Sequence, residues 1–211
     1  MLRKWLPRDY FDPVDMLNFT DTRIVDADLC QLYELPELES LLLGGTQIGD
    51  GGMAHLQRLP QLYELHLDRT QVSDVGLNQV ARITQLEYLL LSGTQVTDSG
   101  LAQIEGLTQL KWLDVSDTRM TDFGLAHVRK FNKLERILLD GTLVSDKGLV
   151  HLRGLANLIL ISLNDTKVTD SGLSHLHKLT QLKVLLLKGT QVTDEGVAEL
   201  QQALPNCAIS R

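Results

Sequence analysis

The stretch Leu86–Gln109, LEYLLLSGTQVTDSGLAQIEGLTQ, contains a pattern that recurs from near the N-terminus almost to the end of the chain. When the chain is aligned on the threonine of this stretch, one Thr falls in the same column every 24 residues: Thr22, Thr46, Thr70, Thr94, Thr118, Thr142, Thr166 and Thr190. A period between about 20 and 50 residues is typical of a solenoid in which each repeat forms one coil. The sequence therefore predicts one elongated body in which each coil contacts its neighbours.

Two apolar spacings alternate within each coil. In the quoted coil, apolar residues lie three apart at Leu101, Ile104, Leu107, Leu110 and Leu113. The spacing then shortens to two, at Val115. A spacing of three suits a helix with one buried stripe, and a spacing of two suits a strand with one buried face. Because crossovers between parallel strands are right-handed, we expect an α/β superhelix with a curved parallel sheet on its concave face and short helices on its convex face.

Three further columns are interpreted as structural. An Asp stands four residues after every Thr, and a Gly stands six after it in every coil but the first, where the residue is Asp28. We expect the Asp to open the helix and to accept N–H groups at its start. We expect the Gly to mark close packing of one coil on the next. The Thr should point inward, where its hydroxyl satisfies a buried backbone group.

The motif L-x-x-L-x-L-x-x-T-x-V-T-D-x-G-L, read from Leu86 to Leu101, resembles the leucine-rich repeat, with Thr where that family usually has Asn or Cys. The resemblance covers the chain from about Val14 to the C-terminus. Its V-T-D-x-G-L helix start is similar to the ribonuclease-inhibitor-like and F-box-associated subfamilies, and most similar to 24-residue repeats of bacterial, notably planctomycete, proteins. The resemblance implies a binding scaffold and names no ligand.

The predicted organisation is a cap followed by one solenoid. Residues 1–13 lie outside the period and are rich in aromatic residues, so we expect them to form a hydrophobic N-terminal cap. Residues 14–211 should form the solenoid, with a half repeat, about seven coils of 24 residues and a short edge strand at 207–209. Such a free edge favours a monomer or a weak homodimer that pairs through it.

Composition excludes several classes of partner. The formal net charge of −7 argues against a nucleic-acid backbone or an anionic membrane. No apolar run reaches the roughly 18 residues of a membrane span, and the charged N-terminus lacks the apolar core of a secretory signal. Cys30 and Cys207 lie in the first and last coils, about 34 Å apart at about 4.8 Å per strand, and cannot pair. We expect a cytoplasmic protein, unless a signal or anchor has been removed upstream of Met1.

The open, concave face of the sheet is expected to display three columns of side chains. The first column is Ser40, Glu64, Tyr88, Trp112, Arg136, Leu160 and Val184. The middle column is Asn18, Leu42, His66, Leu90, Asp114, Leu138, Ser162 and Leu186. The third column is Gly44, Asp68, Ser92, Ser116, Asp140, Asn164 and Lys188. The middle column alternates polar residues with Leu, and the residue three places after it alternates Asp or Arg with Gly, so the duplicated unit is two coils.

The first column departs from repetition at Tyr88, Trp112 and Arg136, which are residue types that dominate binding hot spots. We predict that a protein partner binds there. The rest of the predicted site is the adjacent Leu90, Asp114, Leu138 and Asp140, together with Glu64 and His66. Its acidic members, with Asp68 and Glu87 nearby, suit a basic or mixed partner.

Two alternatives remain. Similarity to F-box-associated repeats suggests a substrate-recognition adaptor, although the 13 residues before the repeats are too short for an F-box. His66 with Asp114 and Asp140 could form an acid–base or metal-dependent hydrolytic site. The chain contains none of the motifs G-x-x-x-x-G-K-[ST], H-E-x-x-H, C-x-x-C and G-x-S-x-G, so we predict no enzyme, no cofactor and no bound metal.

Overall fold

The computed structural model describes residues 14–211, so the predicted cap at 1–13 lies outside the described residues. Within this range the chain forms one parallel sheet in the order of the sequence, with strands β1 (Met16–Asn18), β2 (Ser40–Leu42), β3 (Glu64–His66), β4 (Tyr88–Leu90), β5 (Trp112–Asp114), β6 (Arg136–Leu138), β7 (Leu160–Ser162), β8 (Val184–Leu186) and β9 (Ala208–Ser210). Each residue pairs with the residue 24 positions later, for example Leu89 with Leu113. The predicted register of the repeat is confirmed.

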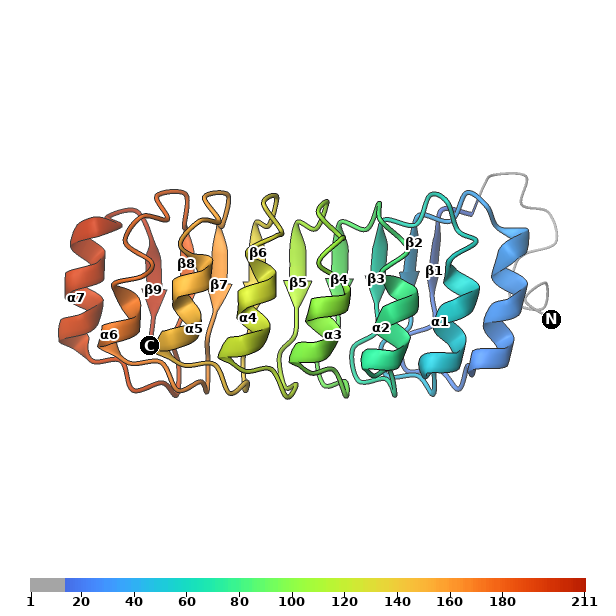
Figure 1. Ribbon diagram of the computed structural model, residues 1–211, viewed down its shortest axis with the longest axis horizontal. Coiled ribbons are helices and arrows are strands. Elements are labelled where there is room, and N and C mark those ends of the chain that lie inside the picture. The colour runs from blue at the N-terminus through green and yellow to red at the C-terminus, as the bar shows by residue number, and fades with distance from the viewer. Residues whose placement is uncertain (1–13) are drawn as a thin grey trace.

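The helices form a second layer on one side of this sheet (Figure 1). They are the 3₁₀ helix η2 (Asp26–Glu34), α1 (Asp50–Leu56), α2 (Asp74–Val80), α3 (Asp98–Gln103), α4 (Asp122–Val128), α5 (Asp146–Leu149), the 3₁₀ helix η3 (Val150–Leu152), α6 (Asp170–Leu173) and α7 (Asp194–Ala203). The C-terminal edge strand begins one residue later than predicted. No helix within residues 14–211 combines the length and apolar character needed to cross a bilayer.

The core runs without interruption between the two layers. The central residue of each strand from β2 to β8 is fully buried: Leu41, Leu65, Leu89, Leu113, Ile137, Ile161 and Leu185. At the two ends, Leu17 of β1 and Ile209 of β9 are only partly buried. The alternating residues of each strand therefore lie on the opposite face, which we call the open face.

The Thr column satisfies backbone carbonyls, as predicted. Thr94 Oγ1 donates to the carbonyl of Leu91 at 2.6 Å, and the same bond recurs in every coil. The column is buried from Thr46 to Thr166, whereas Thr22 at the first coil is exposed. Because the bond spans three residues, it closes the turn that follows each strand.

The Asp column contacts a different coil from the one predicted. Asp50 is the first residue of α1, but its carboxylate accepts the N–H and hydroxyl of Ser73 at 2.7 Å and the N–H of Gly76 at 2.9 Å, all at the start of α2. The bonds to the N–H and hydroxyl of the Ser or Thr recur for Asp74, Asp98, Asp122, Asp146 and Asp170. The prediction that the Asp opens its helix is confirmed, because α1 to α7 each begin at this residue. The prediction that its carboxylate accepts the N–H groups of its own helix is wrong. The N-cap role in α2 belongs to Ser73, whose hydroxyl accepts the N–H of Val75.

The Gly column follows from this link. A Cβ added to Gly76 would lie 2.5 Å from Asp50 Oδ1, so a side chain there would displace the carboxylate. The corresponding glycines in the other coils face the preceding Asp in the same way. The predicted close packing between coils is therefore confirmed, and its cause is the carboxylate of the coil before.

A second Gly column alternates with residues that also have positive φ. Asp21, Arg69, Asp117 and Asp165 have φ between 53° and 57°, and the glycines between them have φ between 66° and 73°. A Cβ added to Gly141 would collide with Oδ1 of Asp117 in the preceding coil, and Gly189 meets Asp165 in the same way. A side chain at Gly45, Gly141 or Gly189 would therefore collide with the Asp of the preceding coil, which favours Gly at these turns. At Gly93 the added Cβ would lie 3.4 Å from Arg69 Cγ, an ordinary contact, so the clash does not explain that position.

Candidate functional site on the open face

The first column of the open face is continuous in space. Glu64, Tyr88, Trp112 and Arg136 are the first residues of β3 to β6, and each is in register with the next. The middle column is equally continuous, because Asp114 pairs with Leu90 on one side and with Leu138 on the other. The structure therefore brings together the predicted residues of β4, β5 and β6.

The aromatic side chains of this region contact one another edge to face. The rings of Tyr88 and Trp112 are 6.5 Å apart with an interplanar angle of 71°, and Arg136 Cζ lies 5.0 Å from the centre of the Trp112 ring. Tyr63 extends the row, with its ring 6.0 Å from that of Tyr88. Edge-to-face and cation–π contacts of this kind each contribute about 0.5–1.5 kcal/mol. We call Tyr63, Tyr88, Trp112 and Arg136 the aromatic row.

Two polar atoms of the β5 coil are buried without a hydrogen-bond partner. Among residues 14–211, Trp112 Nε1 and Ser116 Oγ are the buried side-chain nitrogen or oxygen atoms for which this holds. Ser116 is 6% exposed and follows β5 in the third column. An unsatisfied buried polar group lowers the free energy of unfolding by about 1–3 kcal/mol, so these two atoms destabilise the β5 coil locally.

Asp114 lies between these two residues in the sequence, at the end of β5. Its Oδ1 accepts the N–H of Ser116 at 2.9 Å. The Ser116 hydroxyl also lies close enough to the carboxyl to lower its pKa, but it is not oriented for a well-formed hydrogen bond. Burial raises the pKa of Asp114 above its ordinary value, and the nearby carboxylates of Asp140 and Asp68 raise it further. The negative charge of this carboxylate is therefore disfavoured in the free protein.

Other charged residues on this side of the sheet have partners. Glu64 accepts the hydroxyl of Ser40 at 2.6 Å and pairs with His66 Nε2 at 2.9 Å. Lys111 Nζ lies 2.6 Å from Glu87 Oε2, and this bond raises the pKa of Lys111. Among residues 14–211, neither Asp114 nor Asp140 forms an ion pair, so the uncompensated acidity of the predicted site lies on these two carboxylates.

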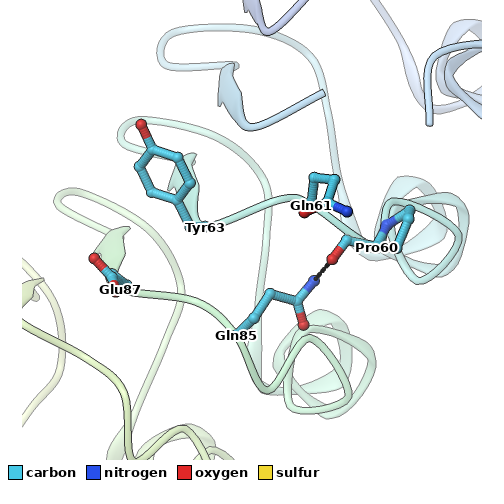
Figure 2. A pocket seen from close by; sticks show the side chains of 5 residues that line it. All are labelled: Pro60, Gln61, Tyr63, Gln85 and Glu87. Atoms are coloured by element: carbon cyan, nitrogen blue, oxygen red, sulfur yellow. Dashed lines mark hydrogen bonds between the residues drawn. The ribbon is translucent and has the colours of Figure 1, made fainter. Parts of the chain in front are cut away.

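A shallow pocket of about 430 Å³ lies beside the aromatic row, where the strands begin. It is lined by Pro60, Gln61, Tyr63, Gln85 and Glu87 (Figure 2). Gln85 Nε2 donates to the carbonyls of Pro60 at 3.1 Å and Leu59 at 3.2 Å, which holds one coil against the next. Burial raises the pKa of Tyr63, and the neighbouring Glu39 and Glu64 raise it further, so its hydroxyl is protonated at neutral pH.

Comparison with known proteins gave structural neighbours only. No protein-family model and no curated protein matches the chain. An internalin (inlF) of Listeria monocytogenes superposes with a TM-score of 0.73 at 23% identity, over 92% of this chain and 52% of the other. Internalin C2 of the same organism gives 0.76 at 24% identity, over 93% and 80%. A leucine-rich-repeat protein of Leptospira interrogans gives 0.62 at 17% identity, over 86% and 51%.

The chain has the leucine-rich-repeat solenoid fold. These neighbours, together with the parallel sheet and its short helices, confirm the fold expected from the repeat. The chain spans about half the length of the inlF internalin and of the Leptospira protein.

The solenoid separates the residues of the hydrolase hypothesis. His66 lies on β3 and pairs with Glu64, whereas Asp114 lies two strands away on β5 and Asp140 follows β6. At about 4.8 Å per strand, His66 is roughly 10 Å from the strand of Asp114. Within the described part of the solenoid, no group of three or more His, Cys, Asp or Glu side chains could hold a metal ion. The acid–base constellation is therefore not formed.

Tyr63 and the Pro60–Gln85 pocket are the parts of the site that the repeat columns missed. Tyr63 stands one residue before the first column of the solenoid, at a position occupied by Glu39, Glu87 and Lys111 in nearby coils. The only signal was an aromatic residue among charged ones. The sequence placed Ser116 in the third column, but no feature of the sequence predicts that its hydroxyl is buried without a hydrogen-bond partner.

Proposed function

We propose that this leucine-rich-repeat solenoid is a non-enzymatic interaction module that binds a protein partner through the open face. The observation that carries the proposal is the continuous contact from Tyr88 through Trp112 to Arg136 across three adjacent strands. Tyr, Trp and Arg are enriched among the residues that dominate binding energy. Elsewhere in the coil, the Thr, Asp and Leu columns repeat because the fold requires them, and the first column is free of that requirement.

The row is suited to binding because it is already held in place. Tyr88, Trp112 and Arg136 project from strands paired on both sides, and Tyr63 directly precedes β3. The edge-to-face contacts restrict the ring torsions. Side chains ordered before binding avoid a cost of about 0.5–1.5 kcal/mol each when a partner arrives. The acidic side chains of Asp114 and Asp140 beside the row favour a partner with basic residues.

The proposal is tested by quantitative affinity capture with matched variants. A Tyr88→Ala/Trp112→Ala double variant removes two rings from the open face, and Phe123→Ala removes an 80% exposed ring from α4 on the helix side. Proteins captured by the wild type should be lost with the double variant and retained with Phe123→Ala. Far-UV circular dichroism confirms that each variant is folded. A partner set that the double variant retains in full would contradict the proposal.

A further inference from the structure

Three features of the β5 coil coincide on the open face. Trp112 Nε1 and Ser116 Oγ are buried without partners, and Asp114 stands between them at two-residue spacing. The equivalent residues of the β7 coil are satisfied, because the Ser162 hydroxyl donates to Asp140 and Asn164 Oδ1 accepts the N–H of Lys188. The unsatisfied groups are therefore a property of one coil and not of the repeat.

The walls on either side of Asp114 are apolar. Leu90 and Leu138 are its register partners on β4 and β6, and both are half-buried on the open face. The two leucines are separated by two strand spacings, about 9.6 Å, with the carboxylate between them. An extended aliphatic chain fits between such walls and places its end at the carboxylate.

The charged groups that affect the ionisation of Asp114 are both negative. They are Asp68 and Asp140 of the third column, and each raises the pKa of Asp114. Between these two residues the third column carries only the small side chains of Ser92 and Ser116. Asp140 is held by the Ser162 hydroxyl and the N–H of Asn164, so its carboxylate is fixed in position. One positive group at this point would face a carboxylate that forms no ion pair with any residue of 14–211.

We propose that Leu90, Asp114, Ser116 and Leu138 form a subsite for a Lys or Arg side chain of the protein partner, with Asp114 as the group that receives its charge. The subsite rests on the proposed function, because it assigns a chemistry to the partner. The leucines hold the aliphatic stem of the incoming side chain, and the Asp114 carboxylate accepts its N–H groups. The Ser116 hydroxyl is buried and cannot reach the incoming group, so it gains a partner when the Asp114 carboxylate turns toward it.

A cationic side chain fits this place better than a hydrated metal ion does. The residues beside Asp114 in its own column are leucines, which offer no oxygen ligands. Hard cations such as Ca²⁺ take about six to eight oxygen ligands. By contrast, Lys and Arg bury their methylene stems against apolar surface while the charged head is hydrogen-bonded.

The test uses the full chain labelled with ¹⁵N and small probes that need no identified partner. N-acetyl-arginine amide and N-acetyl-lysine amide are titrated against the backbone amide spectrum, with N-acetyl-citrulline amide as the uncharged match for arginine. At least one cationic probe should give saturable shifts centred on Leu90, Asp114, Ser116 and Leu138. The citrulline probe should give none of them.

Two variants with the same change in net charge separate the subsite from a general attraction. Asp114→Asn keeps an oxygen to accept the Ser116 N–H and should weaken probe binding about fivefold or more, because a charge-assisted bond is lost. Asp165→Asn, at an exposed turn two coils away, should change it less than about twofold, because surface charges are screened beyond about 10 Å. Equal weakening by both variants would overturn the subsite.

The remaining outcomes are also decisive. Absence of saturable shifts with both cationic probes, equal shifts with citrulline, or shifts at these residues with CaCl₂ alone would each overturn the proposal. Failure here is distinct from failure of the proposed function. If captured partners depend on Tyr88 and Trp112 but neither cationic probe binds, the subsite alone is wrong. If a probe binds at Asp114 but the Tyr88→Ala/Trp112→Ala variant captures the same proteins as the wild type, the subsite stands and the proposed function is wrong.

Discussion

Substitution of Gly76 by Ala should destabilise the protein, although Ala is the better helix former. Gly76 lies in the first turn of α2, where replacing Gly by Ala ordinarily gains about 0.5–1 kcal/mol. Here the added Cβ would lie 2.5 Å from Asp50 Oδ1, against the 3.4–4 Å of an ordinary contact. The carboxylate of the preceding coil must therefore move away.

The cost follows from the bonds that Asp50 makes. Its carboxylate accepts the N–H and hydroxyl of Ser73 and the N–H of Gly76, and a hydrogen bond to a charged group contributes about 1.5–3 kcal/mol. Taken at the lower ends of these ranges, the loss of one such bond and overpacking of about 1 kcal/mol, offset by the gain in helix propensity, leave Gly76→Ala less stable by about 2 kcal/mol. Asp50→Ala alone should cost about 2–4 kcal/mol, because it leaves the N–H groups of the next helix start unpaired.

A double-mutant cycle measured by urea unfolding separates this clash from other effects. In the Asp50→Ala background the carboxylate is gone, but Met53 Cγ and Val72 Cγ1 still lie 3.1 Å from the added Cβ, so Gly76→Ala should cost under about 1 kcal/mol. The coupling energy should then be about 1–2 kcal/mol, above the roughly 0.5 kcal/mol expected of independent sites. Gly106→Ala is the control, because nothing lies within 4 Å of its added Cβ. A cycle that closes within about 0.5 kcal/mol would refute the link between coils.

Three further predictions concern single side chains. Thr94→Val, which removes the buried hydroxyl bond, should cost about 1–2 kcal/mol, while Thr22→Val at its exposed equivalent should cost under about 0.5 kcal/mol in the same unfolding assay. Burial raises the pKa of Asp114 in the folded protein above its unfolded value. The protonated carboxyl therefore stabilises the fold fully below the unfolded pKa, and this stabilisation is lost as pH rises through the folded pKa. Asp114→Asn should accordingly raise Tm at pH 7 and have less effect at pH 3. Exposed Cys30 should react with Ellman's reagent at once, whereas Cys207, which is buried and has its pKa raised by burial, should react only after denaturant is added.

The repeat made the architecture predictable because each column has one geometric role, and the same residue type recurs in that role in nearly every coil. The buried strand centres, the inward Thr hydroxyls and the in-register row of Tyr88, Trp112 and Arg136 all follow from a constant 24-residue offset. The role of Asp50 did not follow, because an Asp at the start of α1 could cap its own helix or the next one with the same spacing. Only the stacking distance between coils decides between these partners.

The electrostatics of the site were less predictable for a related reason. The columns placed Asp114 and Ser116 on the open face, but burial and missing hydrogen bonds depend on side-chain orientations that the period leaves undetermined. His66 illustrates the same limit. Its column position allowed a role with Asp114, whereas its rotamer pairs it with Glu64 on its own strand.

The position of the unsatisfied groups links stability to recognition in this fold. Solenoid coils contact only their neighbours, and the core columns hold each coil in register whatever its open face displays. The β7 coil shows that a satisfied Ser and Asn can occupy the places of Asp114 and Ser116 within the same backbone. The β5 coil therefore retains a half-buried carboxyl that the scaffold does not require, beside a hydroxyl and an indole N–H that are buried without partners. Of these groups, the Asp114 carboxyl is the one that a complementary cationic partner would satisfy.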